Sequence, residues 1–194
     1  MSDNEKIEQN EEYHKKIEIT GISNRYLIKK ITGEKKKNIK RKKVDEWTFN
    51  EDYYKIDEQL NILKINDDDK IDSDKQYICN IINKEIDKKL SGYKQQDKLR
   101  KIYDANNVIT RQKIKDYLLD CNLDCYYCRE KCLILYELQR ENKQWTLDRI
   151  NNDVGHNHDN VVISCLECNI KRRRKSKDAF VFTKQLKIVK KYFI

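Results

Sequence analysis

Two Cys-x2-Cys pairs constrain the fold more than any other feature of the sequence. Cys125 and Cys128 form the first pair, Cys165 and Cys168 form the second, and residues 129–164 lie between them. A turn of this kind directs two sulfur atoms toward one point, and two such turns supply the four thiolates of a closed tetrahedral zinc site. We therefore expect a structural zinc ion whose binding contributes most of the folding free energy of the module around it.

Two other cysteines, Cys121 and Cys132, flank the first pair and are the rival zinc ligands. Each is separated from the pair by three residues, so only Cys125 and Cys128 repeat the spacing of the second pair. Cys79 follows the apolar pattern of a helix and is expected to be a core residue. The seven cysteines are an odd number, and the N-terminal stretch is polar rather than a secretory signal. An intracellular, reducing compartment is therefore expected.

The segment between the pairs predicts two short strands and a turn. Trp145–Ile150 and Val161–Ser164 are apolar or alternate in polarity, as paired strands do, and a Gly-His-Asn-His turn lies between them. Asp148 lies in the first strand, and Asn169 directly follows the last cysteine at the start of a basic helix. If the strands pair and the helix crosses them, the two side-chain oxygens meet. Oxygen ligands suit Mg²⁺ or Mn²⁺, so a catalytic metal is expected there.

One motif contains both the cysteine pairs and the two expected ligands of the catalytic metal: C-x2-C, followed by LDRI-x-N-x2-GH-x3-NVV-x2-C-x2-CN. It resembles HNH endonucleases of the ββα-metal type that carry two zinc knuckles. The runs QWTLDRIN and CLECNIKRR are most similar to HNH proteins of large DNA viruses and phages. The expected reducing compartment is therefore the cytoplasm, the nucleus or a viral factory. The resemblance covers about the last third of the chain. It implies an α+β fold with a ββα-metal module, Asp148 and Asn169 as ligands of the catalytic metal, and Asn160 as the residue that ties the loop to the strand.

The sequence departs from this family at the general base. The family's histidine directly follows the aspartate, and here that position is Arg149. Arginine cannot accept a proton near neutral pH, but it can stabilise a phosphorane-like transition state. His156 is our first choice for the base and His158 the second, because they lie in the turn and titrate in the right range. Tyr126, Tyr127 or a metal-bound hydroxide that needs no protein base are the alternatives.

The charge pattern indicates a nucleic-acid partner. The formal net charge of +9 favours a polyanion, for which we expect DNA, with RNA as an alternative. No apolar run reaches the roughly 20 residues needed to cross a bilayer, so no membrane partner is expected. No small-molecule cofactor is expected either. A basic run at the start of the motif's helix is expected to contact phosphates, with one or two members only solvated: Lys171, Arg172, Arg173 and Arg174.

The same pattern divides the chain into three regions. Residues 1–75 are highly charged and are expected to be largely flexible, with 45–75 as a solvated acidic linker. Residues 76–120 carry apolar residues at three- and four-residue spacing, which predicts a helical platform or, because one face is rich in lysine, a DNA-contacting arm. Residues 121–194 are expected to form the HNH-like zinc module.

Turn and cap residues predict the elements within these regions. Ser91-Gly92 is expected to end a first helix, and Thr110 is expected to cap a helix that ends near Asp120. The other expected elements are a short helix at Gln95–Tyr103, a strand at Leu133–Leu138 and a closing helix at Ala179–Tyr192.

Two functions from different classes fit the sequence. The first is a metal-dependent DNA endonuclease that hydrolyses phosphodiester bonds. The second is a non-catalytic zinc module that binds nucleic acid and has lost the base histidine. Asp148 and Asn169 favour the enzyme, because a protein that only binds nucleic acid has no need of hard metal ligands there. Arg149 favours the binding module.

Overall fold

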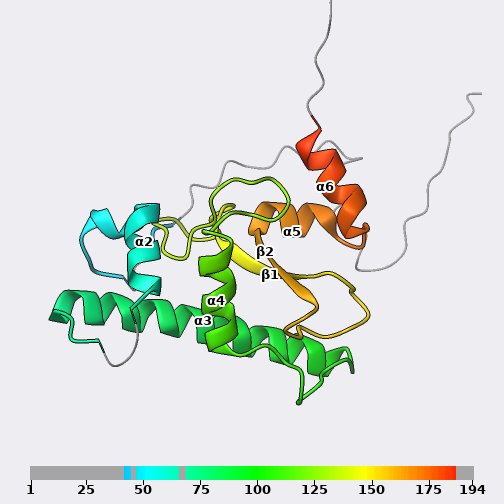
Figure 1. Cartoon of the computed structure of the whole chain (residues 1–194), viewed down its shortest axis with the longest axis horizontal. Helices are drawn as coiled ribbons and strands as arrows, with labels where there is room; N and C mark the ends of the chain where they lie inside the picture. The colour runs from blue at the N-terminus through cyan, green and yellow to red at the C-terminus, as the bar shows by residue number, and fades with distance from the viewer. Residues whose placement is uncertain (1–41, 45–46, 66–68, 187–194) are drawn as a thin grey trace, which may run out of the picture. The chain divides into compact units, whose positions relative to one another are not determined.

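The computed structural model describes residues 42–44, 47–65 and 69–186, in which helices surround a two-stranded sheet (Figure 1). None of the helices in this described part is long and apolar enough to span a membrane. In chain order the elements are η2 (Glu51–Tyr54), α2 (Ile56–Leu63), α3 (Ser73–Leu99), α4 (Arg111–Asp120), β1 (Trp145–Arg149), β2 (Val161–Cys165), α5 (Leu166–Arg172) and α6 (Lys177–Gln185).

β1 and β2 form an antiparallel hairpin, which confirms the predicted strand pair, and Leu147 lies opposite Ile163. Figure 1 shows the hairpin between α3 and α5. All five residues of β1 are buried. The edge of β1 that does not face β2 is satisfied by α3, since the Leu147 N–H donates to the Tyr93 hydroxyl (3.0 Å) and Lys89 Nζ donates to the Trp145 carbonyl (2.7 Å). The hairpin is thereby anchored to a long helix.

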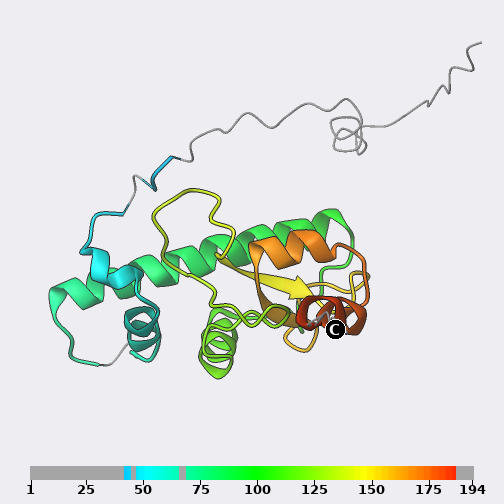
Figure 2. The same cartoon turned by 90° about the horizontal axis from the view of Figure 1, so that it is seen from above.

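The hydrophobic core lies where α2, α3 and α4 meet one another and β2. From above, α3 runs along one side of this module, with the hairpin and α5 beside it (Figure 2). Burial of each large apolar side chain contributes roughly 1.5–3 kcal/mol to stability. Side chains that are 0–1% exposed in this core include Ile82, Ile86, Ile114, Leu118 and Trp145.

The helical platform differs from its prediction in one respect. α3 is a single helix of 27 residues that runs through Ser91 and Gly92, so the predicted break there and the separate helix at 95–103 are wrong. Glycine inside a helix costs about 1 kcal/mol. Packing offsets that cost, because Leu90 is buried and Tyr93 reaches β1. The prediction for α4 is confirmed, with Thr110 accepting a hydrogen bond from the Lys113 N–H and the helix ending at Asp120.

The expectation of a solvated linker over residues 45–75 is wrong for residues 51–63. η2 and α2 lie there, and Ile62 and Leu63 are each only 3% exposed. Gln59 is also buried, and its amide joins α2 to the segment after the first cysteine pair. The acidic composition of residues 51–63 obscured the apolar pattern of a short amphipathic helix in the sequence. Residues 1–41 of the expected flexible region lie outside the described residues.

The apolar run at 133–138 is buried but does not form the predicted strand. The Ile134 and Leu135 N–H groups donate to Gln59 Oε1 (2.8 and 3.1 Å), and the Leu135 carbonyl accepts from its Nε2 (3.2 Å). A side-chain amide therefore replaces a partner strand for these backbone groups. α6 begins behind a Ser176 cap, two residues before the predicted start, and ends at Gln185, while residues 187–194 lie outside the described residues.

Candidate active site and metal centre

The two cysteine pairs meet as predicted. Cys125 and Cys128 lie in the turn after α4, Cys165 ends β2 and Cys168 lies in the first turn of α5, and their four sulfur atoms all lie within 4.8 Å of one another. A tetrahedral zinc site with Zn–S bonds of about 2.3 Å requires sulfurs about 3.8 Å apart. Cys128 Sγ and Cys165 Sγ are 4.0 Å apart. The cluster can therefore hold a structural metal such as zinc, with no coordination position left for chemistry.

Backbone N–H groups point at these sulfurs, as they do around metal-bound thiolates. The Cys165 N–H donates to Cys125 Sγ (3.3 Å), and the Cys168 N–H donates to Cys165 Sγ (3.4 Å). Hydrogen bonds from the Cys132 thiol, and then from Cys165 and Cys168, lower the pKa of Cys125. The rival ligand Cys132 thus lies beside the cluster, while Cys121 Sγ instead contacts the Leu118 carbonyl (3.6 Å). Neither belongs to the four-sulfur group.

A cavity of about 850 Å³ opens between the end of α3, β1, the following loop and α5. Tyr93 and Gln96 reach it from α3, and Arg100 reaches it from the C-cap of that helix. Six of the residues selected from the sequence also line it: Asp148, Arg149, His156, Asn169, Arg173 and Arg174.

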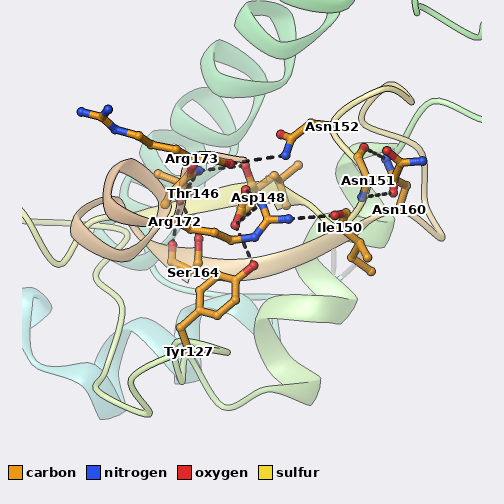
Figure 3. A network of polar contacts seen from close by, with 12 residues as sticks. Tyr127, Thr146, Asp148, Ile150, Asn151, Asn152, Asn160, Ser164, Arg172 and Arg173 are labelled. Carbon is orange, nitrogen blue, oxygen red and sulfur yellow. Dashed lines mark hydrogen bonds and ion pairs between the residues drawn. The ribbon is translucent and has the colours of Figure 1, made fainter. Parts of the chain in front are cut away.

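Asp148 lies at the centre of a buried polar network (Figure 3). Its Oδ2 accepts from the Tyr127 hydroxyl (2.7 Å), and Arg172 Nη1 lies 2.9 Å from Oδ1 and 3.1 Å from Oδ2. Burial raises the pKa of Asp148, while the Tyr127 and Arg172 hydrogen bonds oppose the rise. The carboxylate is held in one orientation and, with about four lone pairs, retains room for another ligand.

Tyr127 is removed as a candidate base by the same network. Burial, and then its hydrogen bond to Asp148, raise the pKa of the Tyr127 hydroxyl far above its ordinary value of 10. It is therefore a donor at neutral pH. Tyr126 lies in a separate groove beside β2, not in the cavity.

Asn169 is fixed with its amide nitrogen toward β1. Nδ2 donates to Thr146 Oγ1 (3.0 Å) and to the Leu147 carbonyl (3.2 Å). Among the described residues, no hydrogen bond reaches Oδ1. Because Cys168 precedes Asn169, a metal on the four sulfurs would fix the helix start that carries this amide. The amide oxygen is thus the atom left for a ligand in the cavity.

Arg149 and His156 both contact a residue that the sequence reasoning missed, Asp97 of α3. Arg149 Nη1 lies 3.6 Å from Asp97 Oδ1 and has no hydrogen-bond partner in the described structure. Burial, followed by the nearby Arg100, lowers the pKa of Arg149. His156 is 3% exposed, and its Nδ1 lies 2.9 Å from Asp97 Oδ1. Burial lowers the pKa of His156 below its ordinary value of 6.5, and Asp97 opposes this shift.

Asp97 and Arg100 had a weak signal in the sequence. Leu90, Tyr93 and Asp97 follow one another at three- and four-residue spacing, which places the aspartate on the buried face of its helix. Arg100 belongs to the basic platform over residues 76–120, for which the sequence also permits the role of a DNA-contacting arm.

Asn160 and His158 lie outside the cavity lining. Asn160 Oδ1 accepts from the Asn151 N–H (2.9 Å), and its Nδ2 donates to the Asn151 and Gly155 carbonyls (both 2.9 Å). It ties the loop closed, which is the role that the resemblance implied, and it does not line the cavity. His158 is exposed, with Nδ1 3.2 Å from the Asn107 carbonyl, and is removed as the second choice of base.

The basic run divides into three kinds of residue. Arg172 is 1% exposed and bonds Asp148 and the Ile150 carbonyl (2.8 Å), so its expected phosphate contact is wrong. Lys171 is exposed, pairs with Glu167 and does not line the cavity. Arg173 and Arg174 do line it.

Comparisons with known protein families, curated proteins and solved structures find no match to this chain. The function is therefore argued from the cavity and from the motif that lines it.

Proposed function

We propose that this protein is a metal-dependent DNA endonuclease of the HNH, ββα-metal type. The observation that carries the proposal is the convergence of a carboxylate, an amide oxygen, a buried histidine and several arginines on one cavity. Hydrolysis of a phosphodiester requires these groups: hard ligands for a cation, a proton acceptor and positive charge for the phosphate. The antiparallel hairpin followed directly by α5 is the arrangement that the motif implies.

The donor set suits Mg²⁺ or Mn²⁺. Asp148 would supply a carboxylate oxygen and Asn169 would supply Oδ1, which no described group occupies. Mg²⁺ commonly binds one or two protein oxygens and keeps water and substrate phosphate as its other ligands. When bound, such an ion supplies charge stabilisation at the phosphate and a more acidic water.

The remaining roles fall to side chains of this chain. His156, with Nδ1 on Asp97, presents Nε2 as the acceptor of a proton from the attacking water. Arg149, which also lines the cavity, stabilises the charge that develops on the phosphate. Arg100 and Arg173 reach the same cavity from the C-caps of α3 and α5, and hold the neighbouring backbone phosphates.

The sulfur cluster supports this site without taking part in the reaction. Cys165 and Cys168 join the end of β2 to the start of α5, and both Asn169 and Arg172 follow on that helix. A zinc ion on the four sulfurs would therefore fix the ligand amide and the arginine that orients Asp148.

A nucleic-acid-binding module without activity is the second candidate. Two observations favour it: Arg149 occupies the position of the family's base, and Arg172 already neutralises Asp148 in a buried ion pair. In that case the arginines of the cavity would hold phosphates, and no cleavage would follow.

Plasmid cleavage separates the two candidates. We expect the zinc-loaded protein to relax supercoiled plasmid in the presence of Mn²⁺ or Mg²⁺, and Asp148→Ala to abolish this activity. Because that change leaves the buried Arg172 unpaired, Asn169→Ala is the companion variant. Asp159→Asn, which alters an exposed carboxylate in the loop between β1 and β2 and outside the cavity lining, is the matched control. A folded wild type that binds DNA but is as inert as Asp148→Ala across metals and pH values would establish the binding module.

A further inference from the structure

α3 contributes a buried carboxylate to the loop that carries His156. Asp97 is 1% exposed and lies near the C-terminal end of α3. Its Oδ2 accepts the backbone N–H of His156 (2.7 Å), while Oδ1 and Oδ2 lie 2.9 and 3.0 Å from Nδ1 of the same residue. One carboxylate therefore holds both the backbone and the ring of one histidine.

The loop approaches the C-terminal end of α3 and the residues that follow it so closely that only glycine fits before the histidine. A Cβ on Gly155 would lie 2.6 Å from the Ile102 carbonyl oxygen and 3.0 Å from Asp97 Oδ2. The ring of His156 also stacks on Tyr93, with centroids 4.4 Å apart and planes inclined by 25°. The imidazole is thus fixed at Nδ1 by the carboxylate and on one face by the tyrosine.

The other ring nitrogen is the free one. No hydrogen bond reaches His156 Nε2 from the described residues, and His156 lines the cavity together with Asp148 and Asn169. A carboxylate can only accept a hydrogen bond from Nδ1, so the proton of the neutral ring belongs on Nδ1 and Nε2 carries the lone pair.

We propose that Asp97 is a positioning residue that holds His156 in the Nδ1–H form, with Nε2 as the proton acceptor facing the cavity. Its catalytic consequence rests on the nuclease proposed above. The Asp97–His156 pair supplies the proton acceptor that the family's histidine would supply at the position occupied here by Arg149. The attacking water gives its proton to Nε2 and its oxygen forms the new P–O bond. The P–O bond to the leaving oxygen breaks, and that oxygen takes a proton from solvent water. The Asp97 carboxylate stabilises the imidazolium that forms.

A rival reading gives Asp97 only a structural role, as a cross-link between α3 and the loop. The response of kcat to a change of tautomer separates the two readings, because a cross-link also places the ring proton on Nδ1 but gives Nε2 no part in cleavage. The chain has three histidines, so their ¹⁵N signals can be assigned with His158→Gln and His156→Gln.

The test is ¹⁵N NMR of the histidine rings in the full-length, zinc-loaded protein, paired with cleavage kinetics. In the wild type we expect Nδ1 of His156 to be protonated and Nε2 to be unprotonated. In Asp97→Asn the amide oxygen must accept the His156 backbone N–H, so the NH₂ group faces Nδ1 and drives the proton to Nε2. With its acceptor blocked, kcat should fall by about 100- to 10,000-fold with KM little changed. Asp74→Asn, which alters an exposed aspartate in the first turn of the same helix, should change neither kcat nor the tautomer.

Each result supports or overturns the role proposed for Asp97. A wild-type His156 protonated on Nε2 would overturn the proposal without any variant, even if Asp97→Asn failed to fold. An Asp97→Asn protein with the tautomer moved but kcat unchanged would overturn it too. The Nδ1–H form in a wild type that never cleaves DNA would leave the orientation by Asp97 standing and defeat the nuclease instead.

Discussion

Arg172 offers the sharpest test of the structure, because the sequence predicts an exposed phosphate contact and the structure buries the residue. Its guanidinium makes hydrogen bonds of 2.9 and 3.1 Å to Asp148 and one of 2.8 Å to the Ile150 carbonyl, and the residue is 1% exposed. Arg172→Ala leaves a buried carboxylate whose remaining side-chain donor is Tyr127. Removing one member of a buried ion pair destabilises a protein by about 3–5 kcal/mol, a large share of the roughly 5–15 kcal/mol that stabilises a typical domain.

Urea unfolding followed by circular dichroism, at a fixed concentration of free zinc, measures this loss. Lys171→Ala is the control, because Lys171 is exposed and pairs with Glu167 only at the surface. Removing its side chain should leave the urea midpoint unchanged. Arg172→Lys keeps the charge but loses the planar fork, and should fall between the two. If Arg172→Ala unfolds within about 1 kcal/mol of the wild type, the buried pair does not exist in solution.

DNA binding supplies an independent check on the same residue. A lost phosphate contact weakens binding and lowers the slope of log affinity against log salt by about one. We expect Arg172→Gln, which removes the charge, to leave this slope unchanged in protein that remains folded. A slope reduced by a full unit would return Arg172 to the phosphate-binding surface.

The remaining predictions concern the metal and the cavity. Elemental analysis should find about one zinc ion per chain, lost in Cys165→Ser and retained in Cys121→Ser; retention in both would refute the four-sulfur assignment. His156→Gln should abolish cleavage and His158→Gln should not. Because burial lowers the pKa of His156 below 6.5, its base form, and with it wild-type activity, should persist as the pH falls through 6.5; a loss centred at or above 6.5 would contradict this. Arg100→Gln should weaken DNA binding and reduce the salt slope by about one, and an unchanged slope would place Arg100 away from the backbone.

The parts of the fold that the sequence predicted correctly are set by short-range chemistry. The spacing Cys165-x2-Cys168 directs two sulfurs to one point whatever surrounds it, and the Thr110 cap acts within its own helical turn. Hairpin formation follows from two apolar runs joined by a polar loop.

The errors have a common physical origin in contacts between residues far apart in the chain. Gln59 supplies the hydrogen bonds of residues 134 and 135, a pairing that no local pattern encodes. The basic residues 171–174 look alike in the sequence, and only the position of Asp148 on β1 decides that Arg172 is the one turned inward. Asp97 is likewise recognised only when its helix lies against the loop of His156.

The ion pair and the proposed catalytic metal make competing demands on Asp148. Arg172 neutralises the carboxylate and so reduces its attraction for a free cation, whereas burial weakens screening and strengthens any attraction that remains. A phosphate that enters the cavity between Arg149, Arg173 and Asn169 would bring the missing negative charge with it. We therefore expect the catalytic ion to bind together with the substrate, not ahead of it. An arginine that holds Asp148 in place before either arrives is then consistent with catalysis, because it fixes the ligand while leaving the ion's affinity dependent on the DNA.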